Sequence, residues 1–527
     1  MSTESALLAA ILAQPDEDTP RLAYADWLDE HADALPGRDP KAVRARAEFI
    51  RLQIAFHRRD EDPDFDGARD RTNALRARHG EVWTAWDPQA SNYAFWNARR
   101  GFPDQTGTEL AVLPHLADDA VARAPVTKLR GTITPDLCAR LAACPHLSRV
   151  RRLELTGAEP VTRDDLDVLF HSPRIIGLRE LWVSWAGDHS TLIAEAAADS
   201  EWLAELESFE FWQNQFTTGA AVALGRSKHL RLRKLTGWCS DCNDTGISAL
   251  AGSHALARTE QLNLRGCKFG PAGAIALARA PHLGPLWYLE LGGTKIGAEG
   301  VTALARCPRL AGLRVLGLDL VRPGSKGLAE LARSEHLREL RRLELYHNAL
   351  HAAGAIVAEG PAFARLRALN LGDNRIGDSG LGALARSSVL GALERLALSG
   401  CGIKEAGAKA LADGDGLRAL THLELGHNRV GAAGAESLAG AGRFPRLRVL
   451  SLRNNFLGDA GATALAKSPH LEALEELNLR SNKIGDAGGR ALLESPHFKN
   501  LKRLDLSHNK MSPALKNAIA KRFEQPE

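Results

Sequence analysis

The sequence lacks the long apolar runs and charge blocks that mark several protein classes. No window approaches about eighteen uninterrupted apolar residues, the length at which a membrane-spanning helix becomes plausible. The net charge is only +3, and acidic and basic residues alternate along the chain. A dedicated nucleic-acid binder usually concentrates its basic charge on one face. We therefore expect neither a membrane-spanning segment nor a nucleic-acid partner.

The sequence also lacks the signs of secretion. Its first residues carry no positive charge, and the apolar run from Ala6 to Ala13 is short, which favours a helix face over a signal peptide. The 7 cysteines are an odd number in a chain of 527 residues, which fits a reducing compartment better than a disulfide framework. The expected location is the cytoplasm.

Catalytic and metal-binding motifs are absent or incomplete. There is no Gly-rich phosphate loop and no recognisable nucleophile elbow. Cys239 and Cys242 form a single C-x-x-C, which is compatible with a redox pair or half a zinc site, but no second C-x-x-C exists. A structural role is favoured because Cys242 falls at a position that is aliphatic in other repeats. We expect no cofactor, no metal and no enzymatic activity.

What the sequence has in abundance is one repeated pattern, L-x-x-L-x-L-x-x-N. About fifteen copies of about 27 residues follow one another in phase. The clear copies begin at Leu340, Leu366, Leu393, Leu420, Leu447, Leu474 and Leu501, and earlier ones begin at Leu313, Leu286, Thr259, Leu232, Leu206, Leu178, Val150 and, degraded, Val126. Such a period predicts a solenoid.

Each repeat combines two periodicities. Leu450 and Leu452 alternate with polar residues, which predicts a strand. The following "GDAGATALAKSP" predicts a helix that Asp459 caps and Pro469 ends. Stacked copies then give a parallel sheet on one side and helices on the other.

The closing Asn of the pattern is expected to be buried, where its amide can satisfy turn backbone that neither strand nor helix pairs. The residues concerned are Asn374, Asn428, Asn455, Asn482 and Asn509, with Cys267 and Cys401 as thiol replacements. His347, His427 and His508 precede this position. They lie several repeats apart, so we interpret them as solvated turn residues and not as a metal site. Cys144 and Cys307 align with Ser468 as small helix-end residues.

The pattern resembles the leucine-rich repeat of the ribonuclease-inhibitor-like subtype, and runs such as Gly407 to Ala412 are similar to its bacterial members. The resemblance covers roughly residues 126 to 511. It implies an α/β horseshoe with a parallel concave sheet, outer helices and an interaction role.

Residues 1–60 do not repeat and predict three helices, from Glu4 to Ala13, Thr19 to Glu30 and Lys41 to Arg58. The stretches "PRLAYADWLDEH" and "RAEFIRLQ" resemble the bacterial repeat-companion domain, and a small core is expected from Leu22, Trp27, Leu28, Phe49, Ile50 and Leu52. Residues 61–125 are interpreted as a transitional capping segment with an Arg-rich helix from Ala68 to His79 and an aromatic patch at Trp83, Trp86, Tyr93, Phe95 and Trp96. Residues 512–527 are expected to form a closing helix.

The outward strand positions carry the functional prediction, because folding does not require particular residues there. Exposed Trp and Tyr are typical anchors of protein interfaces. Trp182, Trp212 and Trp238 fall in successive repeats, so their rings are expected to approach one another. The predicted partner-binding residues on the concave face are Trp182, Glu210, Trp212, Trp238, Tyr288, Glu290, Glu344, Tyr346 and Glu424.

These observations favour a non-catalytic scaffold that binds a protein partner on its concave face, the Glu residues attracting basic groups. Two alternatives remain open, both suggested by the resemblance: a GTPase-activating regulator and a ubiquitin-ligase-adaptor-like effector.

Overall fold

The structure is a computed structural model, and it describes residues 3–13, 18–58, 71, 75, 78–79, 98–99, 102–103, 107–109, 128–158, 160–187, 189–213 and 216–523. The chain divides into two compact units. The first contains Met1–Gln215 and Ser227–Leu232, and the second contains Phe216–Arg226 and Arg233–Glu527.

The first unit begins with three helices, α1 (Thr3–Ala13), α2 (Thr19–His31) and α3 (Pro40–Arg58), close to the predicted bounds. Leu28 and Ile50 form a buried core against which Leu22 and Trp27 pack. Phe49 and Leu52 were expected in the same core, but they belong to a separate cluster with Ala45 and Leu75. The reason is geometric: on α3, Phe49 and Ile50 are adjacent, so their side chains diverge around the helix.

Some predictions fall mainly outside the described residues. The Arg-rich helix is described only at Arg71, Leu75, Arg78 and His79, which are helical. The aromatic patch from Trp83 to Trp96 and the degraded repeat at Val126 lie outside the described part of the chain.

In the first unit, strands β3 to β7 pair in parallel and in chain order. A separate antiparallel pair joins β1 with β2. Their bounds are β1 (Ala98–Arg99), β2 (Phe102–Pro103), β3 (Gly107–Glu109), β4 (Lys128–Ile133), α6 (Pro135–Ala143), η4 (Pro145–Arg149), β5 (Arg152–Ala158), α7 (Arg163–Phe170), η5 (Pro173–Gly177), β6 (Glu180–Ser184), α8 (His189–Asp199), η6 (Glu201–Leu203) and β7 (Ser208–Trp212).

The second unit alternates strand and helix to its end. Its elements are α9 (Thr218–Arg226), β8 (Lys234–Gly237), α10 (Asp244–Ala251), η7 (His254–Leu256), β9 (Gln261–Asn263), α11 (Pro271–Ala278), β10 (Tyr288–Glu290), α12 (Gly297–Ala305), η8 (Pro308–Leu310), β11 (Val315–Gly317), α13 (Gly324–Ala332), β12 (Arg342–Glu344), α14 (Ala353–Ala358), η9 (Pro361–Phe363), β13 (Ala368–Asn370), α15 (Gly377–Ala385), β14 (Arg395–Ala397), α16 (Glu405–Asp413), β15 (His422–Glu424), α17 (Gly431–Gly440), β16 (Val449–Ser451), α18 (Gly458–Ala466), η10 (Pro469–Leu471), β17 (Glu476–Asn478), α19 (Asp486–Leu493), β18 (Arg503–Asp505) and α20 (Pro513–Arg522).

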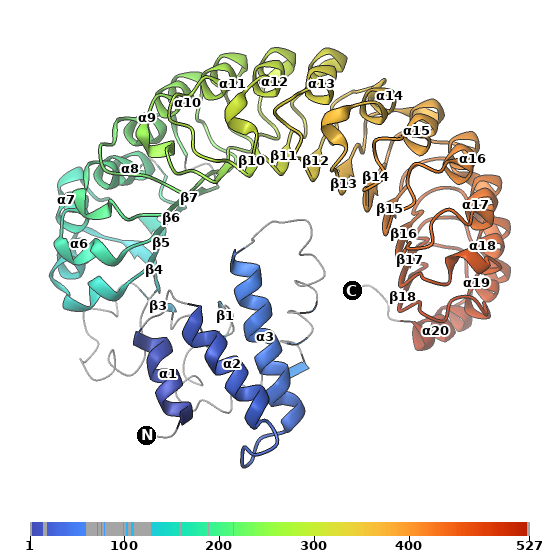
Figure 1. Ribbon diagram of the computed structural model, residues 1–527, viewed down its shortest axis with the longest axis horizontal. Helices are drawn as coiled ribbons and strands as arrows, with labels where there is room; N and C mark the ends of the chain where they lie inside the picture. Colours follow the sequence, from blue (N-terminus) through green and yellow to red (C-terminus); the bar gives the residue numbers. More distant parts are fainter. Residues whose placement is uncertain are drawn as a thin grey trace. The chain divides into compact units, whose positions relative to one another are not determined.

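In this unit every strand from β8 to β18 pairs in parallel with its sequence neighbour. The strands follow the inner edge of an arc and the helices its outer edge (Figure 1). The central leucines pair across the strands, as Leu423 with Leu450 and Leu450 with Leu477, and all are buried. This alternation of parallel strands and helices confirms the predicted α/β leucine-rich-repeat solenoid.

The predicted Asn ladder is present. Asn374 is fully buried, and its Nδ2 donates to the carbonyls of Leu345, Leu371 and Gly372 at 2.7, 3.0 and 3.1 Å. Its Oδ1 accepts from the backbone N–H groups of Asn348 and Leu350 at 2.9 and 3.1 Å. Each amide therefore closes its own turn and completes the turn of the repeat before it.

The thiol replacements also behave as expected. The Sγ atoms of Cys267 and Cys401 donate to the carbonyls of Gly237 and Leu371 in the preceding repeats, at 2.9 and 3.1 Å. Cys144 and Cys307 are buried beside the ends of α6 and α12. Nearer the helices a second ladder runs through serines, as where Ser387 Oγ donates to the Ala358 carbonyl at 2.6 Å.

The prediction for Asp459 was wrong in its target. This residue lies inside α18, whose N-cap is Leu457. Its Oδ1 accepts from the N–H groups of Gly485 and Gly488 at 2.6 and 3.0 Å, at the start of the next helix, α19. The carboxylate therefore caps the neighbouring repeat, because parallel stacking brings successive helix starts side by side.

Candidate partner-binding surface

The predicted surface residues lie on the strands or directly after them. Strand periodicity turns their side chains away from the buried leucines. Five strands and the turns that follow two strands supply them: Trp182 in β6, Glu210 and Trp212 in β7, Tyr288 and Glu290 in β10, Glu344 in β12, Glu424 in β15, Trp238 after β8 and Tyr346 after β12.

In the first unit, two predicted tryptophans are packed together. The ring centroids of Trp182 and Trp212 lie 6.0 Å apart, and the guanidinium of Arg152 lies 4.4 Å from the centre of Trp182. Arg152 also pairs with Glu180 at 2.5 Å. Both rings are half-buried, so cation–π and ring contacts occupy much of their surface. Trp238 belongs to the second unit, where it is 36% exposed.

Two predicted carboxylates are buried. Glu210 accepts from Ser208 Oγ at 3.0 Å. Glu290 accepts from the Gly292 N–H at 2.7 Å and pairs at 3.3 Å with Arg265, which also lies 3.1 Å from Asp319. Burial raises the pKa of both Glu290 and Asp319. One guanidinium therefore holds two desolvated carboxylates, and Glu290 offers little surface to a partner.

The acidic residues further along are more open. Glu344 is half-buried and pairs with Arg342 at 2.7 Å within β12. Glu424 is exposed, and no ion pair of this residue is found among the described residues. Tyr288 is half-buried. The predicted column of glutamates is therefore graded, from Glu290, which is buried, to Glu424, which is open to solvent.

A hollow of about 1170 Å³ lies on the strand face of the second unit and contains two of the predicted residues, Tyr346 and Glu424. Small residues from neighbouring repeats, Ser399, Gly400 and Ser451, leave space there. We call this feature the strand-face hollow. It is lined by Tyr346, Asp373, Ser399, Gly400, Glu424, His427, Val449, Leu450, Ser451, Arg453, Glu476, Leu477, Asn478, Arg503 and Asp505.

The walls of the strand-face hollow are charged and ordered by contacts between repeats. The Tyr346 hydroxyl donates to Asp373 Oδ2 at 2.5 Å, and this bond raises the pKa of Tyr346. Arg453 Nε donates to His427 Nε2 at 2.8 Å. Tyr346 nevertheless keeps 38% of its surface exposed. The hollow thus combines an exposed aromatic ring with charges of both signs, a composition suited to a polar protein interface.

Sequence reasoning missed three large apolar side chains in the turns. Trp185, Leu320 and Phe456 are 70, 46 and 49% exposed, and their φ angles of 57, 60 and 60° are left-handed. Left-handed backbone is sterically unfavourable for bulky side chains, so these turn positions usually hold Gly, Asn, Asp or His. A bulky apolar residue at such a position was the sequence signal that could have identified these exposed side chains.

The cysteines and histidines give no sign of a chemical centre. Cys242 is buried, which raises the pKa of its thiol to about 12, whereas Cys239 is exposed in a left-handed turn. His347, His427 and His508 occupy turns with φ near 54 to 56°. In the described part of the chain, no group of three or more His, Cys, Asp or Glu residues could hold a metal ion.

Within the same described residues, no helix has the length and apolar character needed to cross a membrane.

The comparison with protein-family models agrees with the repeat. The family model described as "Leucine Rich repeat" matches residues 260–278, 286–305, 366–385, 393–412, 417–439, 446–466, 470–493 and 499–514. A crystal structure of an internalin from Listeria monocytogenes is similar over 69% of this chain and 82% of that chain, at 18% sequence identity and a TM-score of 0.37. A search of curated proteins found no match. The matched segments, the strand and helix alternation and the buried leucine columns agree with a leucine-rich-repeat solenoid fold.

Proposed function

We propose that this protein is a non-catalytic scaffold that binds a protein partner on the concave face formed by its strands. The observation that supports the proposal most is the strand-face hollow. It is large enough to accept several side chains, and the small residues Ser399, Gly400 and Ser451 keep it open. Folding requires the buried leucines, but it does not require this gap.

The partner-binding residues predicted from the repeat remain part of this proposal. Exposure ranks them: Trp238, Tyr346 and Glu424 offer the most surface. Tyr346 would serve as an aromatic anchor, since Tyr contributes large contact area at low entropic cost. Glu424 would attract a basic group. Trp182 and Trp212 would present a smaller, half-buried aromatic edge in the first unit.

Several finer assignments belong to the same proposal. The subtype is ribonuclease-inhibitor-like, residues 1–60 form a repeat-companion domain that covers the first repeats, residues 61–125 are transitional, residues 126–511 are the repeats and residues 512–527 close the array. The location is cytoplasmic, the origin bacterial and no cofactor is required. These assignments rest on the sequence patterns described above.

The decisive experiment fills the strand-face hollow. Ser399→Trp and Ser451→Trp, combined, would occupy it, while Ala433→Trp on the exposed side of α17 adds the same side chain elsewhere. Full-length wild type and both variants, each shown to be folded by circular dichroism, are used to capture proteins from a bacterial lysate. A protein retained by wild type and Ala433→Trp but lost by the filled variant supports the proposal. Equal capture by all three chains refutes it.

The two alternatives are tested directly with the same material. A GTPase-activating regulator would accelerate GTP hydrolysis by bacterial GTPases in a purified assay. A ubiquitin-ligase-adaptor-like effector would capture ubiquitin-ligase subunits from a eukaryotic lysate. Either result would replace the general scaffold proposal with the corresponding specific function.

A further inference from the structure

A row of cations follows one edge of the second unit. In each repeat, the residue directly after the ladder position lies in the turn that leads to the helix. We call these positions the rim row. Seven of them are basic and exposed: Lys268, Lys295, Arg322, Arg375, Arg429, Lys483 and Lys510. Because the repeats stack in register, these seven charges occupy the equivalent turn of their repeats.

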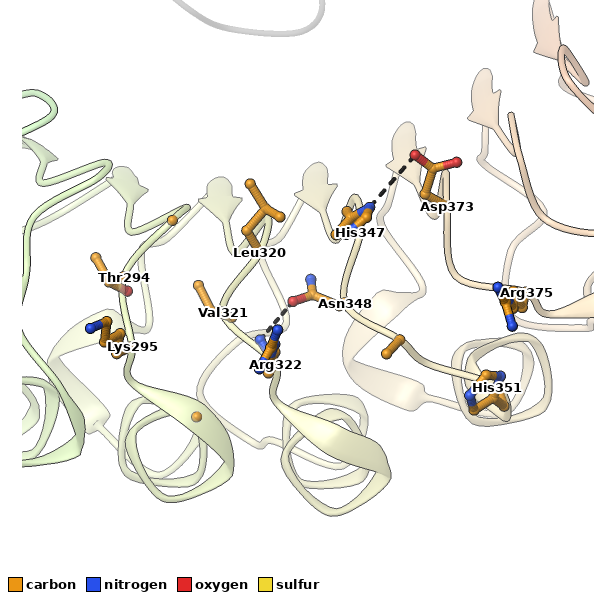
Figure 2. Close-up of a pocket in the computed structure, with 13 residues that line it drawn as sticks. Thr294, Lys295, Leu320, Val321, Arg322, His347, Asn348, His351, Asp373 and Arg375 are labelled. Atoms are coloured by element: carbon orange, nitrogen blue, oxygen red, sulfur yellow. Dashed lines mark hydrogen bonds and ion pairs between the residues drawn. The ribbon is translucent and has the colours of Figure 1, made fainter.

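Three members of the rim row line a second hollow, of about 820 Å³, in the turns after β10, β11 and β13. We call it the rim hollow. Figure 2 shows Lys295 and Arg322 in successive turns and Arg375 two turns further along, with His351 beside Arg375. Neither an ion pair nor a side-chain hydrogen bond of these three cations is found among the residues that the structure describes. Their charges are therefore available to a ligand.

The rim hollow contains a single carboxylate, and it is already engaged. Asp373 accepts from the Tyr346 hydroxyl at 2.5 Å and lies 3.7 Å from His347 Nδ1. It cannot neutralise the three cations at the same time. The hollow is consequently positive overall, with the exposed side chain of Leu320 at its edge.

At several helix starts on this edge, negative charge accompanies the row. Asp244, Asp378, Asp459 and Asp486 stand at the helix starts and accept backbone N–H groups of the next repeat. In the turns after β10, β11 and β12 the aligned positions hold Ala298, Ser325 and Ala352 instead, whereas the turn of Arg375 carries Asp378. Two of the three cations of the rim hollow, Lys295 and Arg322, therefore lack a helix-start carboxylate in their own turns.

We propose that the rim hollow binds an acidic polypeptide segment of the partner that occupies the strand-face hollow. This inference rests on the proposed function. Asp373 lines both hollows, so they adjoin, and a chain leaving one would enter the other. Carboxylate side chains would pair with Lys295, Arg322 and Arg375, since guanidinium groups favour bidentate carboxylate contacts.

The arrangement favours an acidic polypeptide over a nucleic acid. Ala349, Gly402 and Phe456 interrupt the rim row, so a phosphate backbone would meet gaps. Glu424, for which no ion pair is found among the described residues, also lies on the adjacent strand face, and at physiological salt such a charge acts over about 8 Å. An acidic polypeptide, unlike a phosphate backbone, can carry charge only at the residues that face the cations, so the gaps in the rim row do not disfavour it.

The test uses a defined probe, so it does not depend on finding the partner. A fluorescein-labelled hexaglutamate peptide is titrated with the full-length protein at low salt, and binding is followed by fluorescence anisotropy. The rim variant is Arg322→Asn with Arg375→Asn, because Asn tolerates the left-handed φ angles of 55 and 48° at these positions. The matched control is Arg333→Asn with Arg386→Asn, at exposed ends of α13 and α15.

We expect the rim variant to bind hexaglutamate about tenfold more weakly, the effect of losing two exposed ion pairs, and the control to bind within about twofold of wild type. Equal weakening in both variants, or none in the rim variant, overturns the inference. Tighter binding of a six-nucleotide oligothymidine that the rim variant loses would also overturn it, in favour of nucleic acid. If hexaglutamate binds as expected but the filled strand-face variant captures normally, the proposed function has failed and the rim site has not.

Discussion

The two units satisfy the same turn in different ways. In two repeats of the first unit, the ladder positions hold Ala158 and Ala186, and the strands that lead to them, β5 and β6, have 7 and 5 residues. In the second unit, Asn374 and five equivalent asparagines occupy the position in six repeats, and most strands have only 3 residues. The amide does not by itself set the strand length, because β10 and β11 are equally short although Thr294 and Val321 hold their ladder positions. What the amide adds is a set of side-chain partners for the backbone of two turns.

The two units also differ in how the starts of their helices are capped. In the first unit, α6 and α7 are capped within their own repeats by Thr134 and by a capping box of Thr162 with Asp165. In the second unit, Asp459 and Asp486 cap the start of the following repeat. Both units have serine contacts between repeats. The comparison teaches that the second unit adds carboxylate contacts at helix starts to them, although α10 is still capped within its own repeat by Asn243.

The largest effect is expected at the amide ladder. Asn374→Ala removes the partners of two backbone N–H groups and several carbonyls, all buried. We predict a loss of about 3 kcal/mol in the free energy of unfolding, measured by chemical denaturation. The control is Asn478→Ala on the half-exposed strand face, with an expected loss below about 0.5 kcal/mol. Similar losses in both variants would remove the distinction between ladder and surface amides.

The reverse substitution tests the first unit. Ala186→Asn introduces an amide just after β6, where the side chain is only 2% exposed. We predict a destabilisation of about 2 kcal/mol, because a buried polar group gains no matching partner. Trp185→Asn, one residue earlier at a φ of 57°, is the control and should be nearly neutral. A stabilised Ala186→Asn variant would mean that the two units use the position alike.

A smaller gain is expected where a thiol replaces the amide. Cys401 is fully buried and donates a single weak bond to the Leu371 carbonyl. Cys401→Asn would extend the amide ladder between Asn374 and Asn428, so we predict an increase in unfolding free energy of about 0.5 kcal/mol. The comparison variant is Cys401→Ala, which loses the bond without adding an amide. An Asn variant less stable than the Ala variant would show that the site is too small for an amide.

The smallest effect concerns the caps between repeats and their dependence on pH. The N–H of Ser512 donates to Asp486 at 2.6 Å, and this bond lowers the pKa of the carboxyl. Because the pKa of Asp486 is lower in the folded state, its carboxylate stabilises the fold fully at pH values above the unfolded-state pKa of about 4. This stabilisation is lost as the pH falls through the folded-state pKa. Wild type should melt slightly above Asp486→Asn at pH 7, and the difference should shrink as the pH falls below the unfolded value. A constant difference would exclude a contribution from the charge.

The fold was predictable because buried residues repeat. Leucines at a fixed spacing must face one core, so Leu450 could be assigned from the pattern alone. A closing Asn that is buried must bond the backbone of the turn, so Asn374 could be assigned in the same way. Asp459 could not, because its target lies in the next repeat and depends on how closely the helix starts approach one another.

The surface was predictable only in outline. Sequence position placed Glu290 and Glu424 on one face, but Arg265 and Asp319 bury the first while small neighbours leave the second open. Exposure depends on the side chains of adjacent repeats, which the pattern leaves free to vary. The rim hollow escaped prediction for the same reason: Lys295, Arg322 and Arg375 are ordinary surface cations until the stacking of the repeats places them around one hollow.

The direction of the ladder has a consequence for how the chain is made. Asn374 bonds the turn of the repeat before it, and Ser387 does the same near the helices. Synthesis begins at the N-terminus, so each newly emerged repeat waits for about 27 further residues before its turn is closed. During synthesis, the turn of the most recently made repeat therefore stays open until the following repeat has emerged.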